Sequence, residues 1–353
     1  MITIVGAGPV GNYLAYRFAK QNKDVRVVEE HKEIGKPVQC TGIVTSEFGK
    51  IIKPCKKFLI NKVSRAKIFS STNKFTEVKL TKENLILDRT KLDFYLHEQA
   101  KKEGAEYILG KRFEGNHKNK VKINNKVMKT DYLVGADGPF STVAKKNNMS
   151  QGRKFIIGSQ VRTKVNCEKD LVEFYLGVGS FAWLVPESED IARVGVVSYD
   201  NPKPHLDKLL KNRCPGCKTI DRQGGFIPIY NPQQKLMKDN VLLVGDAATQ
   251  VKATTFGGLV PGLIAAETMV DNIEDYHKKA RKRLHKDLYL NLMIRRVMDR
   301  FKEKDYDDLV GMFMKDKVRK IIEEKDRDFP SKFILQLLLK EPRLLKFSSK
   351  LII

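Results

Sequence analysis

The sequence has no long apolar run. No stretch approaches the roughly 20 consecutive apolar residues that a membrane-spanning helix needs. The chain begins directly with the strand-like segment Ile2-Thr3-Ile4-Val5, which leaves no place for a signal peptide. Hydrophobic residues make up 41% and charged residues 31% of the 353 residues, as in globular proteins. We therefore expect a cytoplasmic protein.

The chain is also poor in cysteine. An odd number of cysteines without a repeating framework does not fit a secreted disulfide scaffold. Two of them, Cys214 and Cys217, have the CxxC spacing, but a structural zinc site needs a second pair, so we expect no metal site. A redox pair and an incidental loop both fit this spacing. The remaining cysteines are Cys40, Cys55 and Cys167.

Acidic residues are the minority among the charged ones. The chain has 66 Lys and Arg against 42 Asp and Glu, which gives a net charge of +24. Such an excess favours anionic partners, such as nucleic acids, lipid headgroups, phosphorylated substrates or an acidic electron carrier. The basic residues are spread along the whole chain and no nucleic-acid-reading motif interrupts them. Solvation of the surface explains the charge equally well.

The first 30 residues have the pattern of a strand, a glycine turn, a helix and a second strand. The predicted helix covers about residues 10–21, because Val10, Leu14 and Phe18 recur every four positions as one buried face requires. Residues 25–28 form the second strand, which ends at two glutamates. This order is typical of a nucleotide-binding βαβ unit.

Two later segments predict further elements of the same kind. Residues 83–103 combine a short strand with a helix whose apolar residues are four apart. Residues 118–134 predict a hairpin that turns at Asn124 and Asn125 and returns into 132–134.

The residue pattern of the sequence changes between about residues 150 and 230. Short β-like runs follow one another, which predicts an antiparallel sheet inserted between two halves of the nucleotide-binding part. After Gly262 the chain becomes helical and basic. The β-like runs are 155–158, 172–176, 182–185 and 194–197.

The glycine turn carries the strongest local signal. Gly6, Gly8 and Gly11 have the GxGxxG spacing, in which the first glycine allows a tight turn, the second a close approach to a pyrophosphate, and the third close helix–strand packing. The N-terminus of the following helix presents free N–H groups to the phosphates. Glu29 lies 23 residues after Gly6 and would accept hydrogen bonds from ribose hydroxyls, and the adjacent Glu30 is the alternative.

Two strand-to-turn motifs follow later in the chain. Asp137 and Gly138 end the run 132–138, where they either form only a tight turn or close the parallel sheet near a cofactor. The run 241–248 ends in Gly-Asp-Ala-Ala, and its Asp246 suits a contact to the ribityl chain or pyrophosphate of a flavin nucleotide. Capping of a helix is the other role for Asp246, and the two roles are compatible.

A glycine-rich turn follows the second of these motifs. Gly257, Gly258 and Leu259 precede a helix predicted over 263–270. The positive end of that helix would face the flavin ring and stabilise its reduced, anionic form.

Together these motifs resemble the large FAD superfamily of aromatic hydroxylases. Two further segments are similar to those of the geranylgeranyl reductases. Residues 35–40 match a glycine-x-proline-valine-x-cysteine segment, and residues 181–186 match an aromatic-x-Trp-x-aromatic-Pro motif with a trailing glycine at Gly195. Three features depart from the family pattern: Phe181 stands where Tyr is usual, Val185 where Phe is usual, and Thr41-Gly42 follows the cysteine.

The resemblance implies an α/β fold with a discontinuous domain structure. It implies a Rossmann-like FAD-binding domain of the para-hydroxybenzoate hydroxylase type over 1–150 and 235–275. An inserted antiparallel β-sheet substrate domain would cover 151–234. A basic helical C-terminal region would cover 276–353.

The activity implied by the resemblance is the reduction of isolated C=C bonds in geranylgeranyl chains of isoprenoid lipids, as in archaeal ether-lipid biosynthesis. An isolated alkene has no carbonyl to accept charge, so hydride delivery from reduced FAD needs a proton from a nearby acid. Cys40 is the candidate acid, or it only shapes the pocket as a small apolar residue. Phe181, Trp183 and Pro186 would line the substrate tunnel, with core packing as the alternative for Trp183.

The resemblance also assigns the cofactor contacts. Arg89 would contact FAD, with a structural salt bridge as the alternative. No second GxGxxG occurs, so we expect electrons from a reduced ferredoxin or from NAD(P)H binding at the flavin. The predicted FAD-binding residues are Gly6, Gly8, Val10, Gly11, Glu29, Cys40, Thr41, Arg89, Asp246, Gly257, Gly258 and Leu259.

The C-terminal tail mixes apolar residues and lysines from Lys332 to the end of the chain. This composition is typical of a basic amphipathic helix on a membrane surface, and a helix packed on the body is the alternative. Two other functions stay open at this point. One is an FAD-dependent monooxygenase of the same fold, and the other is a basic nucleic-acid-binding protein with a vestigial nucleotide fold.

Overall fold

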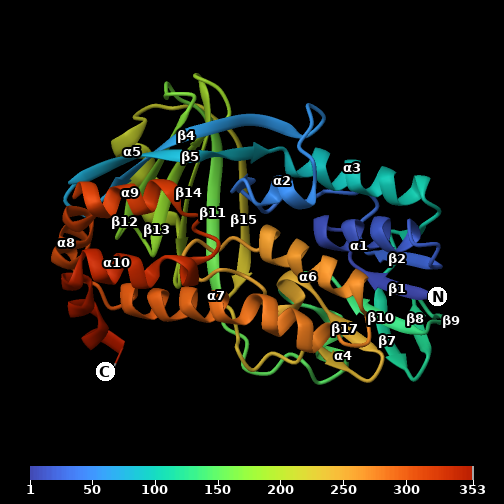
Figure 1. Ribbon diagram of the computed structural model, residues 1–353. Helices are drawn as coiled ribbons and strands as arrows, with labels where there is room; N and C mark the ends of the chain where they lie inside the picture. The colour runs from blue at the N-terminus through green and yellow to red at the C-terminus, as the bar shows by residue number, and fades with distance from the viewer. Residues whose placement is uncertain (352–353) are drawn as a thin grey trace. The chain divides into compact units, whose positions relative to one another are not determined.

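The computed structural model describes residues 1–351, which form a mixed α/β fold (Figure 1). The chain divides into two compact units, and each is built from three separate segments. The first unit comprises residues 1–38, 88–154 and 228–289, and the second comprises 39–87, 155–227 and 290–353.

The first unit contains a six-stranded sheet in the order β16-β17-β10-β1-β2-β6. All its strands are parallel except β16 at the edge. The apolar run Ile2–Val5 is buried at every position, as a central parallel strand requires. The strands are β1 (Ile2–Val5), β2 (Val25–Glu29), β6 (Glu106–Leu109), β10 (Tyr132–Gly135), β16 (Met237–Lys238) and β17 (Val241–Leu243).

The helices of the first unit follow from the same local signals. Helix α1 has Pro9 at its first position and buries Leu14 and Phe18, so the predicted 10–21 helix is confirmed with slightly different ends. Helix α3 begins after Asp88, whose side chain accepts a hydrogen bond from the Lys91 N–H. The bounds are α1 (Pro9–Ala19), α3 (Arg89–Lys102), α4 (Thr142–Lys146), the 3₁₀ helix η1 (Gly245–Ala248), α6 (Leu259–Asp271) and α7 (Tyr276–Met298), whose last nine residues belong to the second unit.

The predicted hairpin is correct in its turn and wrong in its continuation. Asn124 and Asn125 both have positive φ, as a two-residue hairpin turn needs. The returning strand ends at Lys129, and residues 132–135 leave the hairpin to pair in parallel with β1. The small sheet consists of β7 (Phe113–His117), β8 (Lys120–Ile123) and β9 (Lys126–Lys129).

The second unit contains an eight-stranded sheet in the order β15-β11-β14-β13-β12-β4-β5-β3. The four predicted β-like runs are strands of this sheet. Residues 39–87 also belong to it, although their sequence was assigned to the nucleotide-binding part, because β4 pairs in parallel with β12 more than 100 residues later. The strands are β3 (Ile43–Val44), β4 (Leu59–Phe69), β5 (Phe75–Leu87), β11 (Phe155–Lys164), β12 (Leu171–Leu176), β13 (Phe181–Pro186), β14 (Ile191–Ser198) and β15 (Thr219–Pro228).

One face of this sheet has its own apolar core. Leu206 and Leu209 of α5 pack with Ala182, Leu184 and other buried sheet residues. Strand alternation places Phe181 and Trp183 on the other face. The two helices associated with the sheet are α2 (Phe48–Ile51) and α5 (Lys203–Arg213).

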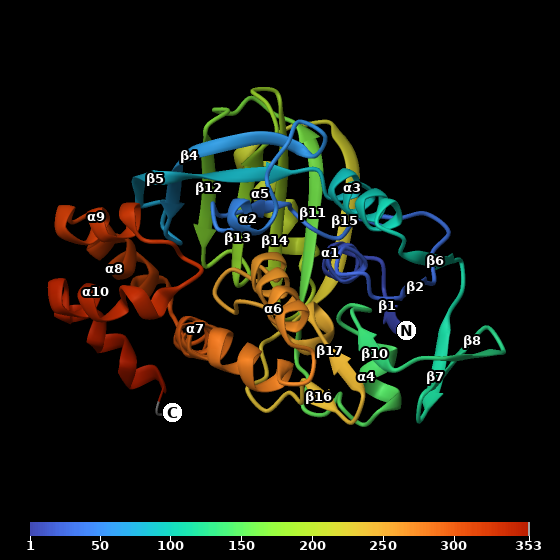
Figure 2. The ribbon, with the colours of Figure 1, turned by 45° about the vertical axis from the view of Figure 1, so that its right-hand side comes forward.

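The end of the described chain is helical, as predicted (Figure 2). Two small apolar cores hold these helices together, and Phe313 and Leu344 contact both of them. Within residues 1–351, no helix is long and apolar enough to cross a membrane. The elements are α8 (Glu303–Phe313), α9 (Asp316–Glu324), η2 (Pro330–Lys332), α10 (Ile334–Lys340) and η3 (Pro342–Leu351).

Candidate functional site

The turn after β1 is shaped by glycines that have different surroundings. Gly6 has φ +103°, and a Cβ there would lie 2.4 Å from the Ala136 carbonyl oxygen. A Cβ at Gly11 would lie 2.0 Å from the Gly6 carbonyl oxygen. A Cβ at Gly8 would meet no atom within 4 Å. Gly6 and Gly11 therefore make the close packing possible, whereas Gly8 leaves open space at the N-terminus of α1.

Glu29 at the end of β2 reaches back to this turn. Its Oε2 accepts a hydrogen bond from the Ala7 N–H at 2.8 Å, and its Oε1 accepts one from the His31 N–H at 2.9 Å. Glu30 is exposed and pairs with Arg112 at 3.5 Å. Of the two candidate acids, Glu29 is thus the one that lies against the glycine turn.

Arg89 lies within electrostatic range of two acids. Its Nη2 is 3.1 Å from Asp93 Oδ2, so the structural salt bridge is present. Burial raises the pKa of Asp93 to about 6, although Arg89 acts to lower it. Burial likewise raises the pKa of Asp246 to about 6, and Arg89 is the charge that opposes this shift. The structure therefore brings Arg89 and Asp246 to the same region of the first unit.

The motif around Asp246 packs against both flanking helices. A Cβ at Gly258 would lie 2.6 Å from Asp246 Oδ1, and a Cβ at Gly262 would lie 2.8 Å from Val10 Cγ2. Helix α6 begins at Leu259, four residues earlier than predicted, with Gly258 as its N-cap. Asp246 lies inside the 3₁₀ helix η1, whose N-cap is Val244, so Asp246 is not a helix N-cap.

Asp137 has a structural role that its sequence context only partly indicated. Its carboxylate accepts hydrogen bonds from Ser141 Oγ at 2.6 Å and from the Val143 N–H at 3.0 Å, at the start of α4. Burial raises the pKa of Asp137. No sequence motif marks Arg153, which donates hydrogen bonds to the carbonyl oxygens of Pro139 and Ala247. Arg153 thereby ties the turn after β10 to the turn after β17.

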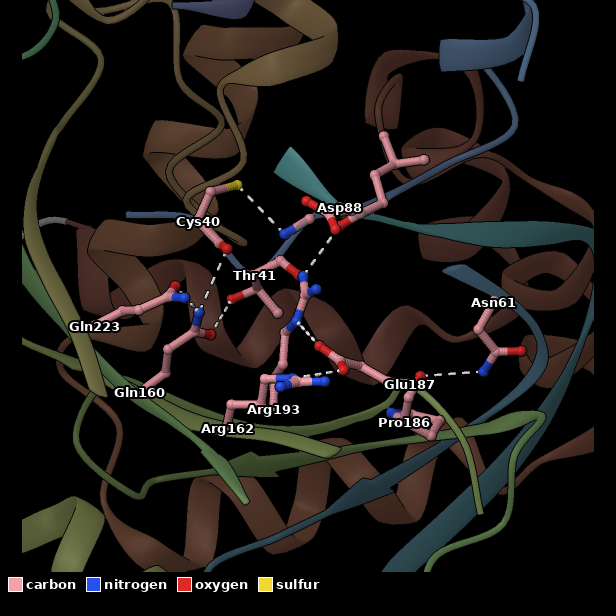
Figure 3. A network of polar contacts seen from close by, with 12 residues as sticks. Cys40, Thr41, Asn61, Asp88, Gln160, Arg162, Pro186, Glu187, Arg193 and Gln223 are labelled. Carbon is pink, nitrogen blue, oxygen red and sulfur yellow. Dashed lines mark hydrogen bonds and ion pairs between the residues drawn. The ribbon is translucent and has the colours of Figure 1, made fainter. Parts of the chain in front are cut away.

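In the second unit, the loop that carries Cys40 is held by side chains from the sheet (Figure 3). Cys40 Sγ accepts a hydrogen bond from the Gly42 N–H at 3.3 Å. Gln160 Nε2 donates to the Cys40 carbonyl at 3.4 Å, and Thr41 Oγ1 donates to Gln160 Oε1 at 2.8 Å. We define residues 40–42 as the Cys40 loop.

An arginine and a buried glutamate complete the support of the Cys40 loop. Arg193 donates hydrogen bonds to the carbonyl oxygens of Thr41 and Leu87. Its Nε also donates to Glu187 Oε1 at 2.7 Å, and Arg162 donates to the other oxygen of Glu187 at 2.7 Å. Gln160 lies 120 positions after Cys40, and Arg193 lies 152 positions after Thr41. No local motif marks these supporting residues.

Trp183 lies across a glycine on the neighbouring strand. Trp183 and Gly195 are paired between β13 and β14, and a Cβ at Gly195 would lie 2.4 Å from Trp183 Cζ2. The ring of Phe181 is 5.7 Å from that of Trp183, centre to centre. Within the described residues, the buried Nε1 of Trp183 has no hydrogen-bond partner. Gly195 thus provides the flat surface that the indole needs.

Pro186 does not share this surface. In β13 successive side chains point to opposite faces, so Pro186 lies on the face opposite Phe181 and Trp183. Its carbonyl accepts a hydrogen bond from Asn61 Nδ2 at 3.1 Å. Phe181 and Pro186 are an odd number of positions apart, so a regular strand cannot place both side chains on one face. That Pro186 lines the substrate tunnel with Phe181 and Trp183 stays a prediction.

The CxxC pair follows α5. All five cysteines are free, and Cys214 is buried. Burial raises the pKa of Cys214 to about 12, and the nearby Cys217 thiol adds to this shift. The Cys214 thiol is therefore protonated at neutral pH, unlike the activated thiols of redox motifs.

The first unit fits a dinucleotide. It offers open space at Gly8 beside the N-terminus of α1, a carboxylate at Glu29, and a second helix N-terminus at Gly258 close to Asp246. Free N–H groups at a helix N-terminus bind phosphate oxygens. Arg89 supplies a positive charge in the same region.

Comparison with known proteins agrees with this geometry. A family model for NAD(P)-binding Rossmann-like domains matches residues 4–41. The chain is 27% identical to the digeranylgeranylglycerophospholipid reductase of Methanocaldococcus jannaschii, over 99% of this chain and 98% of that protein. The resemblance to geranylgeranyl reductases, predicted from the sequence, is confirmed by this near full-length similarity.

Solved structures show the same fold. A geranylgeranyl bacteriochlorophyll reductase-like protein from Thermoplasma acidophilum superposes with a TM-score of 0.84 and 23% identity, covering 99% of this chain and 98% of that one. A halogenase in complex with FAD superposes with a TM-score of 0.69 and 11% identity, covering 99% of this chain and 85% of that one. The predicted α/β fold class is thereby confirmed.

Proposed function

We propose that this protein is an FAD-dependent reductase that saturates isolated C=C bonds in the geranylgeranyl chains of isoprenoid lipids. The observation that carries the proposal is the similarity to a digeranylgeranylglycerophospholipid reductase over 99% of the chain. The glycine turn with Glu29 and the second turn at Asp246 support a bound dinucleotide in the first unit.

The residues that would hold FAD come from the motifs of the first unit. Gly6, Gly8 and Gly11 with the α1 N-terminus would hold the pyrophosphate, and Glu29 the ribose hydroxyls. Val10, Arg89, Asp246 and the turn 257–259 would contact the rest of the cofactor. When bound and reduced, the flavin supplies the hydride.

Cys40 is our proposed proton donor, and the adjacent Thr41 would contact FAD. An isolated alkene must receive a proton as well as a hydride, because it has no carbonyl to accept charge. The hydrogen bond from the Gly42 N–H fixes the position of the Cys40 sulfur, which supports a directed role for the thiol. A thiol that is held by the backbone gives its proton without reorganisation of the loop.

The substrate chain would lie against Phe181 and Trp183. These rings form an apolar surface on the sheet face opposite the α5 core. Pro186 would act only through the strand backbone. An apolar surface suits a terpenoid chain because burial of each CH₂ group is favourable by about 0.8 kcal/mol.

A reductase of this kind needs a redox partner. Reduced ferredoxin is the donor that we favour, because an acidic carrier suits a chain with net charge +24. NAD(P)H at the flavin is the other donor to test. A lipid substrate also implies a cytoplasmic protein that works at the inner surface of the membrane.

The decisive experiment is anaerobic reduction of a geranylgeranyl glycerophospholipid by the purified, dithionite-reduced protein, followed by mass spectrometry. We expect a flavin absorbance spectrum and a gain of two hydrogens per bond. A gain of oxygen in air would instead identify a monooxygenase. A colourless preparation that binds DNA with steep salt dependence would identify a nucleic-acid-binding protein.

The role of Cys40 is tested separately with Cys40→Ser. We expect the rate of saturation to fall by about 100-fold or more, as for loss of a general acid, while the flavin content stays unchanged. Cys55→Ser is the matched control, because Cys55 is also half-buried but lies outside the Cys40 loop. Full activity of Cys40→Ser would mean that the thiol only shapes the pocket.

A further inference from the structure

The C-terminal helices expose apolar side chains that their own cores do not need. Leu335, Leu339, Leu345 and Leu351 are between 42% and 72% exposed. We define these four leucines as the C-terminal apolar patch. Scattered exposed leucines need no explanation, but four within 17 residues form a concentrated apolar surface.

Helix α10 points two of these leucines away from its core. Leu337 is buried in the core formed with Val318 and Ile321 of α9. Leu335 and Leu339 are four residues apart and so share one face of the helix, while Leu337, two residues from each, points to the opposite side. Exposure of Leu335 and Leu339 is therefore a consequence of the packing of Leu337.

The 3₁₀ helix η3 repeats this arrangement with a period of three. Leu344 and Phe347 pack into the apolar cores, and Lys350 on the same side pairs with Asp305 at 2.9 Å. In a 3₁₀ helix, residues three apart share a face, so Leu345 and Leu351 lie together on a different face. Helix α10 and the 3₁₀ helix η3 thus both pack one side into the small apolar cores and expose leucines on another side.

The segment that carries the patch is basic, although Lys346 pairs with Asp308 of α8 at 2.5 Å. Between residues 332 and 351 the chain has five basic residues and one acidic residue. The acidic residue, Glu341, is only 2% exposed and is neutralised by Lys315 and Arg343. No exposed carboxylate lies within this described segment. Its exposed basic residues are Lys332, Lys340, Arg343 and Lys346.

We propose that the C-terminal apolar patch and its basic residues dock this protein on the surface of an anionic lipid bilayer. Leucines bordered by lysines and arginines are suited to the interface, where the apolar side chains insert and the charges meet anionic headgroups. Membrane docking rests on the proposed function in one respect only: a reductase of lipids that is docked on the bilayer would take its substrate from that bilayer.

A second copy of the chain is a less suitable partner for this patch. Self-association would bring the same basic residues together within about 10 Å, where like charges are poorly screened. The net charge of +24 adds to this repulsion. An anionic surface instead attracts the residues that border the leucines.

Vesicle co-sedimentation of the full chain tests the proposal. The probes are vesicles of phosphatidylcholine alone and vesicles with one third phosphatidylglycerol. We expect wild-type protein to bind the anionic vesicles. The double variant Leu335→Ser/Leu339→Ser should bind at least tenfold more weakly, from the lost apolar burial. The variant Lys332→Gln/Lys340→Gln should bind about tenfold more weakly, at roughly 1 kcal/mol per charge.

Matched controls come from the β8–β9 hairpin in the first unit. Val127 is 64% exposed among lysines, so Val127→Ser removes an equally exposed apolar residue, and Lys120→Gln/Lys126→Gln removes two exposed charges. Both controls should bind like wild type. Equal losses in patch and control variants would mean non-specific attraction and would overturn the proposal. So would absence of wild-type binding, or a wild-type dimer that the leucine variant converts to a monomer with unchanged vesicle binding.

Activity in detergent separates this proposal from the proposed function. With detergent-dispersed geranylgeranyl lipid, the patch variants should reduce substrate at the wild-type rate. If no variant and no wild-type protein reduces the lipid, yet vesicle binding depends on the patch, the reductase proposal fails and the docking surface stands.

Discussion

The glycine turn of the first unit and the Cys40 loop of the second unit are fixed by different physical means. Backbone sterics shape the turn, because Gly6 and Gly11 have no room for a Cβ. Long-range hydrogen bonds shape the loop, because Gln160 and Arg193 donate to its carbonyl groups and Glu187 accepts a hydrogen bond from Arg193. The steric constraint on the turn is visible in the sequence as glycines at a fixed spacing. The partners that hold the Cys40 loop instead come from strands more than 100 residues away and carry no local pattern.

The largest effect should come from adding one carbon to the glycine turn. Gly11→Ala places a Cβ 2.0 Å from the Gly6 carbonyl oxygen, so helix α1 must shift. We expect the free energy of unfolding to fall by about 3 kcal/mol or more, because backbone atoms cannot yield easily. Urea denaturation measures this change.

The control for that variant is three residues earlier. Gly8→Ala meets no atom within 4 Å, so its unfolding free energy should change by about 0.5 kcal/mol or less. The same methyl group would occupy the space offered to the pyrophosphate, so retention of FAD should drop. Equal stability losses in the two variants would contradict the steric account of the turn.

The next effect concerns the support of the Cys40 loop. Arg193→Met leaves Glu187 with one arginine instead of two and leaves the Thr41 and Leu87 carbonyls without this donor. We expect a loss of about 2–3 kcal/mol in unfolding free energy. The Cys40 thiol should also react faster with iodoacetamide, measured by mass spectrometry of the labelled peptide.

Arg162→Met is the matched control for this effect. Arg162 is more exposed than Arg193, and its Nε pairs with Glu187 rather than with the loop. It should cost about 1 kcal/mol and leave the reactivity of Cys40 unchanged. Faster labelling in both variants would show that the loop is held by Glu187 and not by Arg193 directly.

An effect of at most the same size, and one that depends on pH, comes from the buried acid Asp93 of the first unit. Because burial raises the pKa of Asp93 to about 6, the folded state keeps a proton that the unfolded state releases near pH 4. Stability from this group is therefore present below about pH 4 and is lost as pH rises through about 6. The difference amounts to about 2–3 kcal/mol at most.

Asp93→Asn should remove this contribution to the pH dependence. Its unfolding free energy, measured in urea between pH 4 and 7, should change less with pH than that of the wild type. An unchanged slope would mean that Arg89 keeps Asp93 ionised throughout. Asp246 has a similarly raised pKa, so part of the slope should remain.

The smallest effect concerns one hydrogen bond of the Cys40 loop. Thr41→Val removes the hydroxyl that donates to Gln160 Oε1 and keeps the side-chain shape. We expect a loss of about 1 kcal/mol in unfolding free energy. A loss as large as that of Arg193→Met would show that Gln160, rather than Arg193, is the main support of the loop.

The same contrast explains which parts of the molecule could be predicted from the sequence. The GxGxxG spacing and the apolar periodicity of α1 and α3 are local patterns, so these elements could be predicted, although the group that crowds Gly6 is Ala136, 130 positions later. The pairing of β4 with β12 could not be predicted, because it joins segments about 105 residues apart without a local motif. For this reason residues 39–87 were assigned to the wrong unit.

The residues of the candidate site also divide into those with a local sequence pattern, which could be predicted, and those without one, which could not. Glu29 was found because it ends a strand at the expected distance from Gly6. Arg153, Gln160 and Arg193 were missed, because the groups that they contact are distant in the sequence. The motif that contains Pro186 did not show that its side chain lies on the other face of β13 from Phe181 and Trp183, because strand faces depend on the register of the sheet.

The packing of Trp183 against Gly195 offers a way to change, in small steps, the width of the apolar surface formed by Phe181 and Trp183. A methyl group at position 195 has no space beneath the indole, so the ring must tilt or slide away from the sheet. The variants Gly195→Ala and Gly195→Ser would displace the Trp183 ring by small steps. The packing on the opposite face of the sheet, against α5, would stay unchanged. To redesign the protein for shorter or straighter hydrocarbon substrates, one would therefore first enlarge residue 195 and leave the aromatic rings of Phe181 and Trp183 intact.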